Sequence, residues 1–428
     1  MANNKIPPSE KIRKEIKDLL KGIGVEENGN IFSQLMEKAK LLIVEELLEK
    51  EVEEFLERKY YQRNKEISEK RGYRNGYEKN RINTPEGTLT LEIPQVRDTE
   101  EPFKSRIKKF FKTNTDILEK LATEMYVRGL STRDIEEALY SATGDRVLSK
   151  SKVSQVTDIL WQEYQDFITR DLSIYDIVYL IIDAVYESIR PYIKSEEAIL
   201  VAYGITIDGK KVLLHMELGN KESYEFCKEF LRDMVKRGLN TPISITSDGA
   251  PGLVKAIEEI FPKSLRIRCW VHKMRNLSNK VPKEIWLKIK AEVEVIRNSL
   301  NYEEGKKRLV ECAEKYRDEY PSFVKCLLED SEALLNVLKL PYRHRISVRS
   351  SNLIERVFVE ERRRTKIIPQ FLMERSCLKL VFSVLWRASY RWQRIPVAEY
   401  EKKQIEELRE QLGIDRERIN LKKEKVSK

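Results

Sequence analysis

The sequence predicts a multidomain α/β protein, and three observations lead to this fold class. The chain has 428 residues, enough for two or three domains and at least one large core. The spacing of its apolar residues is helical at first, strand-like from residue 177, and helical again over residues 283–340. Turn signals such as Asp208-Gly209 separate the strand-like runs, as they do in hairpins.

Composition limits the location and the partners of the chain. Lys and Arg number 80 against 70 Asp and Glu, and the resulting net charge of +10 favours a polyanionic partner only weakly, because the acids are interspersed. No apolar stretch approaches the ~20 residues that a membrane span requires, and the N-terminus lacks the apolar region of a secretory signal. Five scattered cysteines are typical of reduced thiols. We therefore expect a cytoplasmic protein with no membrane partner.

Residues 1–70 are expected to be helical, either packing on the body of the protein or pairing with a second subunit. Residues 71–112 have turn signals and an alternating strand from Thr88 to Ile93, which predicts a basic β-hairpin. Arg74 in this segment suits a phosphate contact, although an exposed hairpin has a similar composition.

Residues 113–170 predict three short helices in a helix-turn-helix arrangement. Val153, Val156, Ile159 and Leu160 are expected to face inward from the third helix. The outward face near its N-terminus, from which recognition helices contact DNA, then carries Lys150, Lys152 and Gln155. Three-helix units that bind no DNA are also common, so this pattern does not decide alone.

The central segment begins with IVYLIIDAVY, a continuous apolar run typical of a buried strand. A hairpin, a helix, a short strand, a helix from Pro251 and another strand follow, and the order β-β-β-α-β-α-β is that of a ribonuclease H-like fold. We thus expect a ribonuclease H-like catalytic core with an all-α insertion, preceded by helical and helix-turn-helix DNA-binding regions. The core is expected over residues 171–282 and 341–398, the insertion over 283–340 and a charged tail over 399–428.

Carboxylates stand where a ribonuclease H-like core places them. Asp183 lies on the first strand and Asp248 follows the fourth, although Asp248 also suits the cap of the helix that begins near Pro251. A third acid is expected on a later helix, within RSSNLIERVFVEERRRTK. Three oxygen donors suit Mg²⁺, and two such ions would serve phosphodiester cleavage.

The sequence resembles the Mutator-type insertion-sequence transposases over about residues 55–395. The motifs that carry the resemblance are RGYRNGY, VRGLSTRDIEEAL, DAVYESIR, SDGAPGLVKAIEEIFP with RCWVHKMRN, and NLIERVFVEERRRTK. The resemblance implies a DDE triad with a helical insertion between its second and third acids, and these acids fall on Asp183, Asp248 and Glu355. Glu360 and Glu361 remain rivals to Glu355, because Glu361 stands where the family usually has an apolar residue.

The helix that carries these three glutamates has a clear periodicity. At about 100° per residue, Glu355 lies at one border of an apolar stripe and Glu360 beyond the other border. Glu355 also suits a capping box with an Asn352 N-cap. The members of the stripe are Ile354, Val357, Phe358 and Glu361.

The resemblance implies an activity and its partners. It implies a homodimeric transposase of the bacterial nucleoid that binds the terminal inverted repeats of its insertion sequence as double-stranded DNA. Two Mg²⁺ ions, with Mn²⁺ as a substitute, would serve end cleavage and strand transfer by the freed 3′-hydroxyl. The alternatives are a ribonuclease H-like nuclease or resolvase, and a non-catalytic DNA-binding regulator derived from a transposase.

Other side chains are expected to support the site or to contact DNA. Cys269 and His272 form a Cys-x-x-His pair, but structural zinc needs four ligands and no second pair is close in sequence. We therefore expect these two residues to pack or to hydrogen-bond beside the active site. Trp386 and Trp392 are expected to be core or helix-packing residues rather than to stack on bases. The expected phosphate contacts are Lys273, Arg275, Arg362, Arg363 and Arg364, although a charge run also suits a solvated face.

Overall fold

The computed structural model describes residues 6–23, 31–62, 72–189, 196–219, 223–366, 368, 371 and 373–414. These form two compact units: the first extends to Tyr126 and from Leu130 to Thr157, and the second comprises Val127–Gly129 and the chain from Asp158 onward. Arg71 of the RGYRNGY motif and residues 415–428 of the charged tail lie outside the described residues. Across the described part of the chain, no helix combines the length and apolar character needed to cross a membrane.

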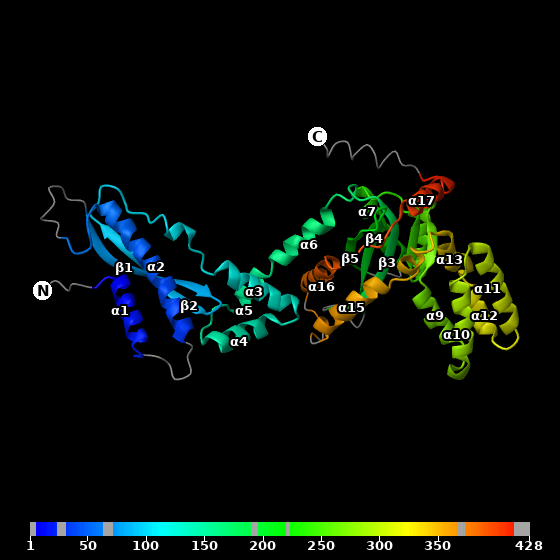
Figure 1. The fold of residues 1–428 in the computed structure, drawn as a ribbon, viewed down its shortest axis with the longest axis horizontal. Coiled ribbons are helices and arrows are strands. Elements are labelled where there is room, and N and C mark those ends of the chain that lie inside the picture. Colours follow the sequence, from blue (N-terminus) through cyan, green and yellow to red (C-terminus); the bar gives the residue numbers. More distant parts are fainter. Residues whose placement is uncertain are drawn as a thin grey trace. The chain divides into compact units, whose positions relative to one another are not determined.

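The first unit begins with two helices and a long hairpin (Figure 1). Helix α2 packs on β2, where Leu48 and Val52 of the helix are buried with Leu91 of the strand. Two acids of α2 accept hydrogen bonds from neighbouring segments: the Glu92 amide donates to Glu45 at 2.6 Å, and the Ser105 hydroxyl donates to Glu51 at 2.5 Å. The predicted strand is therefore present within a longer hairpin. The elements are α1 (Pro8–Leu20), α2 (Ile31–Leu56), β1 (Tyr73–Thr84), β2 (Gly87–Arg97) and the 3-10 helix η2 (Lys108–Phe110).

The first unit ends with three helices, α3 (Asp116–Val127), α4 (Thr132–Thr143) and α5 (Lys150–Val156). Ser131 caps α4 in a capping box with Asp134, and the Ser149 hydroxyl accepts from the first turn of α5. Their shared core consists of Leu118, Ala122, Ile135, Leu139, Val147, Leu148 and Val153.

One expectation for this region is wrong. Ile159 does not face inward from the third helix, because α5 ends at Val156 and the chain turns at Thr157. Ile159 instead opens the next helix, α6 (Ile159–Thr169), and is 58% exposed, whereas Leu160 of the same helix is buried as expected. The division between the two units falls directly before Asp158, so residues 113–170 contribute helices to both units.

The second unit contains a five-stranded mixed sheet in the order β5-β4-β3-β6-β7. Strand β3 pairs antiparallel with β4 and parallel with β6, which explains its continuous apolar sequence. The predicted Asp208-Gly209 turn joins β4 to β5, with Gly209 at a φ of +79°. The strands are β3 (Ile177–Ser188), β4 (Glu196–Thr206), β5 (Lys211–Gly219), β6 (Ser244–Ser247) and β7 (Leu265–Arg268).

Helices cover both faces of this sheet (Figure 1). Leu180 and Ile182 of β3 belong to a core that includes residues of α7 (Tyr224–Lys236) and α8 (Pro251–Ile260). Because side chains alternate along a strand, Asp183 points to the opposite face. Helices α15 (Asn352–Thr365) and α16 (Glu374–Ser389) contact strands of the sheet, β3 and β5 respectively.

The remaining helices follow β7 and confirm that residues 283–340 are helical. Trp386 of α16 stacks on Phe382, and Trp392 packs on Tyr203 of β4, so both tryptophans pack as predicted. The bounds are α9 (Trp270–Ser278), α10 (Lys283–Arg297), α11 (Tyr302–Tyr316), α12 (Pro321–Leu328), α13 (Ser331–Leu335), η3 (Asn336–Lys339), α14 (Arg345–Val348) and α17 (Glu399–Gln411).

Candidate active site

Two carboxylates lie where the pairing of the parallel strands β3 and β6 ends: Asp183 within β3, just beyond its last residue paired with β6, and Asp248 just after β6. In the β3–β6 pairing, Tyr179 lies opposite Ser244 and Ile181 opposite Thr246. The same register, continued by two residues, brings Asp183 opposite Asp248. Asp183 is buried, and the charge of Asp248 acts on its pKa. The two acids are therefore neighbours at an edge where α/β sheets place their chemistry.

The turn after β6 fixes the position of Asp248. Helix α8 begins at Pro251 as expected, but its N-cap is Ala250, so Asp248 is not the helix cap. The Ala250 amide instead donates to Asp248 Oδ1 at 3.1 Å across the turn. Gly249 between them has a φ of +81°, and a Cβ there would meet the Arg268 guanidinium at 1.8 Å. The positive φ favours glycine at this position, and any other residue would also displace the Arg268 guanidinium.

The third acid, Glu355, lies in the first turns of α15. This helix begins at Asn352 with Ser351 as its N-cap, so the capping box with an Asn352 N-cap is wrong. The Glu355 amide donates to the Ser351 carbonyl at 3.0 Å, and the Ser351 hydroxyl donates to Glu355 Oε1 at 3.1 Å. The hydrogen bond from the N-cap serine thus fixes the Glu355 carboxylate at the N-terminal end of α15.

Backbone contacts tie the beginning of α15 to the strand ends. The Thr246 hydroxyl on β6 donates to the Val348 carbonyl at 2.7 Å. The Trp270 amide, at the beginning of α9, donates to the Arg349 carbonyl at 2.9 Å. These two bonds hold the segment before α15 against β6 and the beginning of α9, where Ser351 links Glu355 to Asp183.

Ser351 is a residue of this site that the sequence did not single out. It is 1% exposed, and its hydroxyl lies 3.5 Å from Cys269 Sγ. It also hydrogen-bonds the carboxyl group of Asp183, which lowers the pKa of that acid. One hydroxyl therefore joins β3, α9 and α15. The only signal for it was its spacing of four residues before Glu355, which is common along helices.

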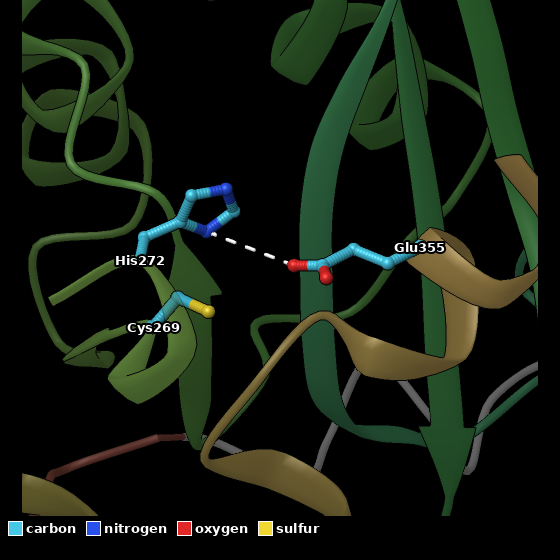
Figure 2. Close-up of side chains that lie close together, drawn as sticks. All are labelled: Cys269, His272 and Glu355. Atoms are coloured by element: carbon cyan, nitrogen blue, oxygen red, sulfur yellow. Dashed lines mark ion pairs between the residues drawn. The ribbon is translucent and has the colours of Figure 1, made fainter. Parts of the chain in front are cut away.

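Cys269 and His272 face the same space as Glu355 (Figure 2). His272 Nδ1 lies 3.9 Å from Glu355 Oε1, and the buried Cys269 precedes it by one helical turn. Hydrogen bonding with Cys269 raises the pKa of His272. Burial raises the pKa of the Cys269 thiol, but His272 and Ser351 outweigh burial and leave this pKa below its usual range.

The electrostatics of the site favour a bound cation. Burial raises the pKa of Asp183 to about 6, and the charge of Asp248 adds to this, whereas His272 and Ser351 oppose it. His272, whose pKa Cys269 and the neighbouring acids raise, is the cationic group that acts on Asp183. The oxygen donors of Asp183 and Asp248, one buried and one beside it, suit Mg²⁺.

The rival glutamates occupy other surroundings. Glu360 is exposed and pairs with Arg363 and Arg364. Glu361 belongs to the buried stripe of α15, as the periodicity predicted, and its carboxyl lies against Glu187, further along β3. Burial and the charge of Glu187 raise the pKa of Glu361. Neither rival shares the surroundings of Asp183.

Most of the expected DNA contacts are exposed. On α5, Lys150 and Gln155 are exposed and Lys152 is half-buried. Arg275 on α9 is exposed, as are Arg362 and Arg363 on α15, whereas Arg364 is partly covered. These side chains remain candidates for phosphate contacts.

Two expected DNA contacts are engaged inside the protein. Lys273 is 2% exposed, and its ammonium group donates to the Glu329 carbonyl at 2.5 Å. Arg74 donates to the Arg58 carbonyl at 2.9 Å and lies over the Tyr60 ring. Helix geometry explains the first correction, because Lys273 falls on the inner face of α9 with Trp270 and Leu277. We do not retain either residue as a DNA contact.

Comparison with known proteins places this arrangement in a family. A family model described as "Transposase, Mutator family" matches residues 14–395. The transposase for insertion sequence element ISRM5 of Rhizobium meliloti is 30% identical over 82% of this chain and 86% of that protein. The transposase for IS6120 of Mycolicibacterium smegmatis is 31% identical over 63% of this chain and 84% of that protein. The transposase for IS256 in transposon Tn4001 of Staphylococcus aureus is 30% identical over 82% and 89%. The chain therefore belongs to the Mutator family of insertion-sequence transposases.

Proposed function

We propose that this transposase binds the terminal inverted repeats of its insertion sequence, cleaves their ends and transfers the freed strands. The observation that carries the proposal is the meeting of Asp183, Asp248 and Glu355 around Ser351 and His272 at one edge of the sheet. Asp183 and Asp248 have no structural need to lie close together, because burial raises the pKa of Asp183 and the charge of Asp248 raises it further.

The fold supports a ribonuclease H-like catalytic domain. Three antiparallel strands are followed by two that run parallel to β3, and the central strand carries the first acid. Helices α10 to α13 stand between the second acid and the third, where the family resemblance implies an insertion. In the first unit, α3 to α5 support a helix-turn-helix with α5 as the recognition helix, since its exposed N-terminal turn carries Lys150 and Gln155.

Asp183, Asp248 and Glu355 would hold the catalytic metal ions, for which Mg²⁺ fits and Mn²⁺ is a substitute. When bound there, two divalent ions supply an activated nucleophile and a stabilised leaving oxygen. The residues of the chain position the acids: Ser351 orients Glu355, and the turn at Gly249 holds Asp248 beside Asp183.

The exposed arginines Arg362 and Arg363 extend from the same helix as Glu355 and would bind the phosphates that flank the scissile bond. Two element ends must be joined, so we propose that the protein acts as a homodimer on double-stranded DNA. Each subunit would bind one end.

The test is cleavage and strand transfer on end-sequence DNA in Mg²⁺. Asp183→Asn, Asp248→Asn and Glu355→Gln are each expected to abolish both reactions while leaving end binding nearly intact, because each removes a charge and preserves shape. Glu360→Gln is the matched control on the same helix and is expected to remain active. Cleavage above a few per cent of the wild-type rate by any of the first three variants would remove that residue from the metal set.

The same assay separates the alternative functions. A ribonuclease H-like nuclease or resolvase would cleave without joining a 3′-hydroxyl to target DNA. A non-catalytic regulator would bind the ends and do neither. The proximity of Asp248 to the buried Asp183 favours the catalytic function, because a regulator gains nothing from a second carboxylate beside a buried aspartate.

A further inference from the structure

Three side chains of different ligand chemistry meet beside the proposed catalytic carboxylates. The Cys269 sulfur, a His272 ring nitrogen and a Glu355 carboxylate oxygen all lie within 4.8 Å of one another. Figure 2 shows all three directed into the same space, two from the beginning of α9 and one from α15. Within the part of the chain that the structure describes, this is the one group of His, Cys and acidic side chains with such spacing.

We propose that Cys269, His272 and Glu355 form a site for a thiophilic divalent cation of the zinc class, which competes with the catalytic ions for Glu355. The binding site stands on its own geometry. Its inhibitory consequence rests on the proposed function, in which Glu355 is a catalytic ligand. The sequence did not indicate this site, because the third ligand lies on a helix far along the chain from the Cys-x-x-His pair.

The geometry needs only a small adjustment to bind such an ion. Tetrahedral zinc with bonds of about 2.0 to 2.3 Å separates its ligand atoms by about 3.3 to 3.6 Å. Closing the present group to that spacing requires movements of about 1 Å, within the reach of side-chain rotation. Cys269 is the N-cap of α9 and His272 lies in its first turn, so one rigid element presents two of the ligands.

The site is also open to an entering ion. The His272 side chain is 23% exposed and that of Glu355 is 27% exposed, whereas Cys269 is fully buried beneath them. Three protein ligands leave a fourth position for water, as in catalytic rather than structural zinc sites.

The ligand set distinguishes this site from the magnesium set. Thiolate and imidazole favour zinc-class ions, whereas Mg²⁺ prefers oxygen donors alone. Binding breaks the sulfur–hydrogen bond of Cys269, releases its proton to solvent and forms a sulfur–metal bond. An ion bound there also takes the Glu355 carboxylate as a ligand, so this carboxylate is less available to the catalytic ions bound by the aspartates. The expected result is reversible inhibition by zinc at concentrations far below those of Mg²⁺.

The binding test uses Co²⁺ alone as a spectroscopic probe on the full-length protein. The wild type is expected to show a thiolate-to-cobalt charge-transfer band that Zn²⁺ displaces. Cys269→Ser is expected to abolish the band, and His272→Gln to weaken cobalt affinity by more than about 100-fold, which exceeds the loss of an outer-shell partner. Cys312→Ser, a substitution of a buried cysteine on α11, is the control and is expected to leave the band unchanged.

Asp248→Asn separates this proposal from the proposed function. It is expected to keep the cobalt band while losing end cleavage. A cobalt band together with retained end cleavage in this variant would uphold the metal site and overturn only the catalytic assignment of Asp248. Absence of the band in the wild type, or wild-type affinity in both Cys269→Ser and His272→Gln, overturns the site. Wild-type cobalt affinity in Glu355→Gln would show that Glu355 is not a ligand of this site, and would overturn the proposed competition between the zinc-class ion and the catalytic ions.

Discussion

Asp183→Asn is expected to stabilise the metal-free protein while it abolishes cleavage. Burial raises the pKa of this acid from 3.8 to about 6 in the folded chain. A carboxyl group whose pKa is higher in the folded state binds its proton more tightly there. Its contribution to stability is therefore complete below the unfolded pKa and is lost as the pH rises through the folded pKa.

The magnitude follows from the two pKa values. At ~1.4 kcal/mol per pH unit, the difference between 3.8 and about 6 amounts to about 3 kcal/mol at pH 7.5. At pH 5 the acid is largely protonated in the folded chain, and the same relation leaves about half of that penalty. Asparagine keeps the shape without the charge, so the variant is expected to exceed the wild type in unfolding free energy by these amounts.

Urea unfolding in EDTA at pH 7.5 and pH 5, followed by tryptophan fluorescence, measures this difference. All five tryptophans lie in the second unit, so the signal reports on the domain that carries the site. Glu360→Gln is the control and is expected to give no gain, because Glu360 is an exposed partner of arginines. Adding Mg²⁺ should reduce the difference in unfolding free energy between variant and wild type, since the ion binds and stabilises only the protein with the Asp183 carboxylate. A variant less stable than the wild type at pH 7.5, or a gap that does not shrink at pH 5, refutes the reasoning.

Three further predictions concern other parts of the chain. The double substitution Lys150→Ala and Lys152→Ala is expected to reduce the slope of log affinity against log salt by about 1.8, since each lost phosphate contact removes about 0.9. Titrations with end-sequence DNA at several salt concentrations measure this slope, and an unchanged slope contradicts the two phosphate contacts. Glu361→Gln is expected to gain stability over the wild type as the pH rises from 6 to 8, because burial raises the pKa of Glu361 and the cost of ionising this buried acid grows with pH. The same urea assay measures the difference in unfolding free energy, and a variant that becomes less stable than the wild type as the pH rises would contradict the prediction. Gly249→Ala is expected to lower the free energy of unfolding by about 1–3 kcal/mol, because the φ of Gly249 is +81° and the new Cβ meets the Arg268 guanidinium. Thermal unfolding tests this prediction, and an unchanged stability would mean that the turn relaxes freely.

The sequence predicted the order of strands and helices well, because periodicity and turn chemistry are local. The run IVYLIIDAVY gave the central strand, and the Asp208-Gly209 turn gave the hairpin beside it. Its errors arose where a local signal had two outcomes. The apolar Ile159 fitted a longer third helix, but the chain turns before it and uses it to open α6. Lys273 looked like a free cation, but tertiary packing around α9 buries it.

The site was predicted less completely, because its contacts join segments that are distant in sequence. The pairing of β3 with β6 brings Asp183 to Asp248, and strand order in the core anticipated this. Ser351 and the meeting of Cys269 with Glu355 depend on where α15 lies against α9, which no periodicity encodes. A serine between two carboxyl groups is found only once the sheet edge and the helix are both in place.

The departure from the family pattern at Glu361 illustrates how the site tolerates change. Glu361 occupies the apolar stripe of α15, and its carboxyl lies against that of Glu187, with Thr365 donating to Glu187 at 3.2 Å. Burial and the neighbouring charge raise the pKa of Glu361, so near neutral pH the pair holds a proton and carries one negative charge rather than two. A protonated carboxyl fills the stripe much as an apolar side chain does. We infer that α15 keeps its rotation about its own axis, so Glu355 still faces Ser351 and His272 although Glu361 replaces an apolar residue.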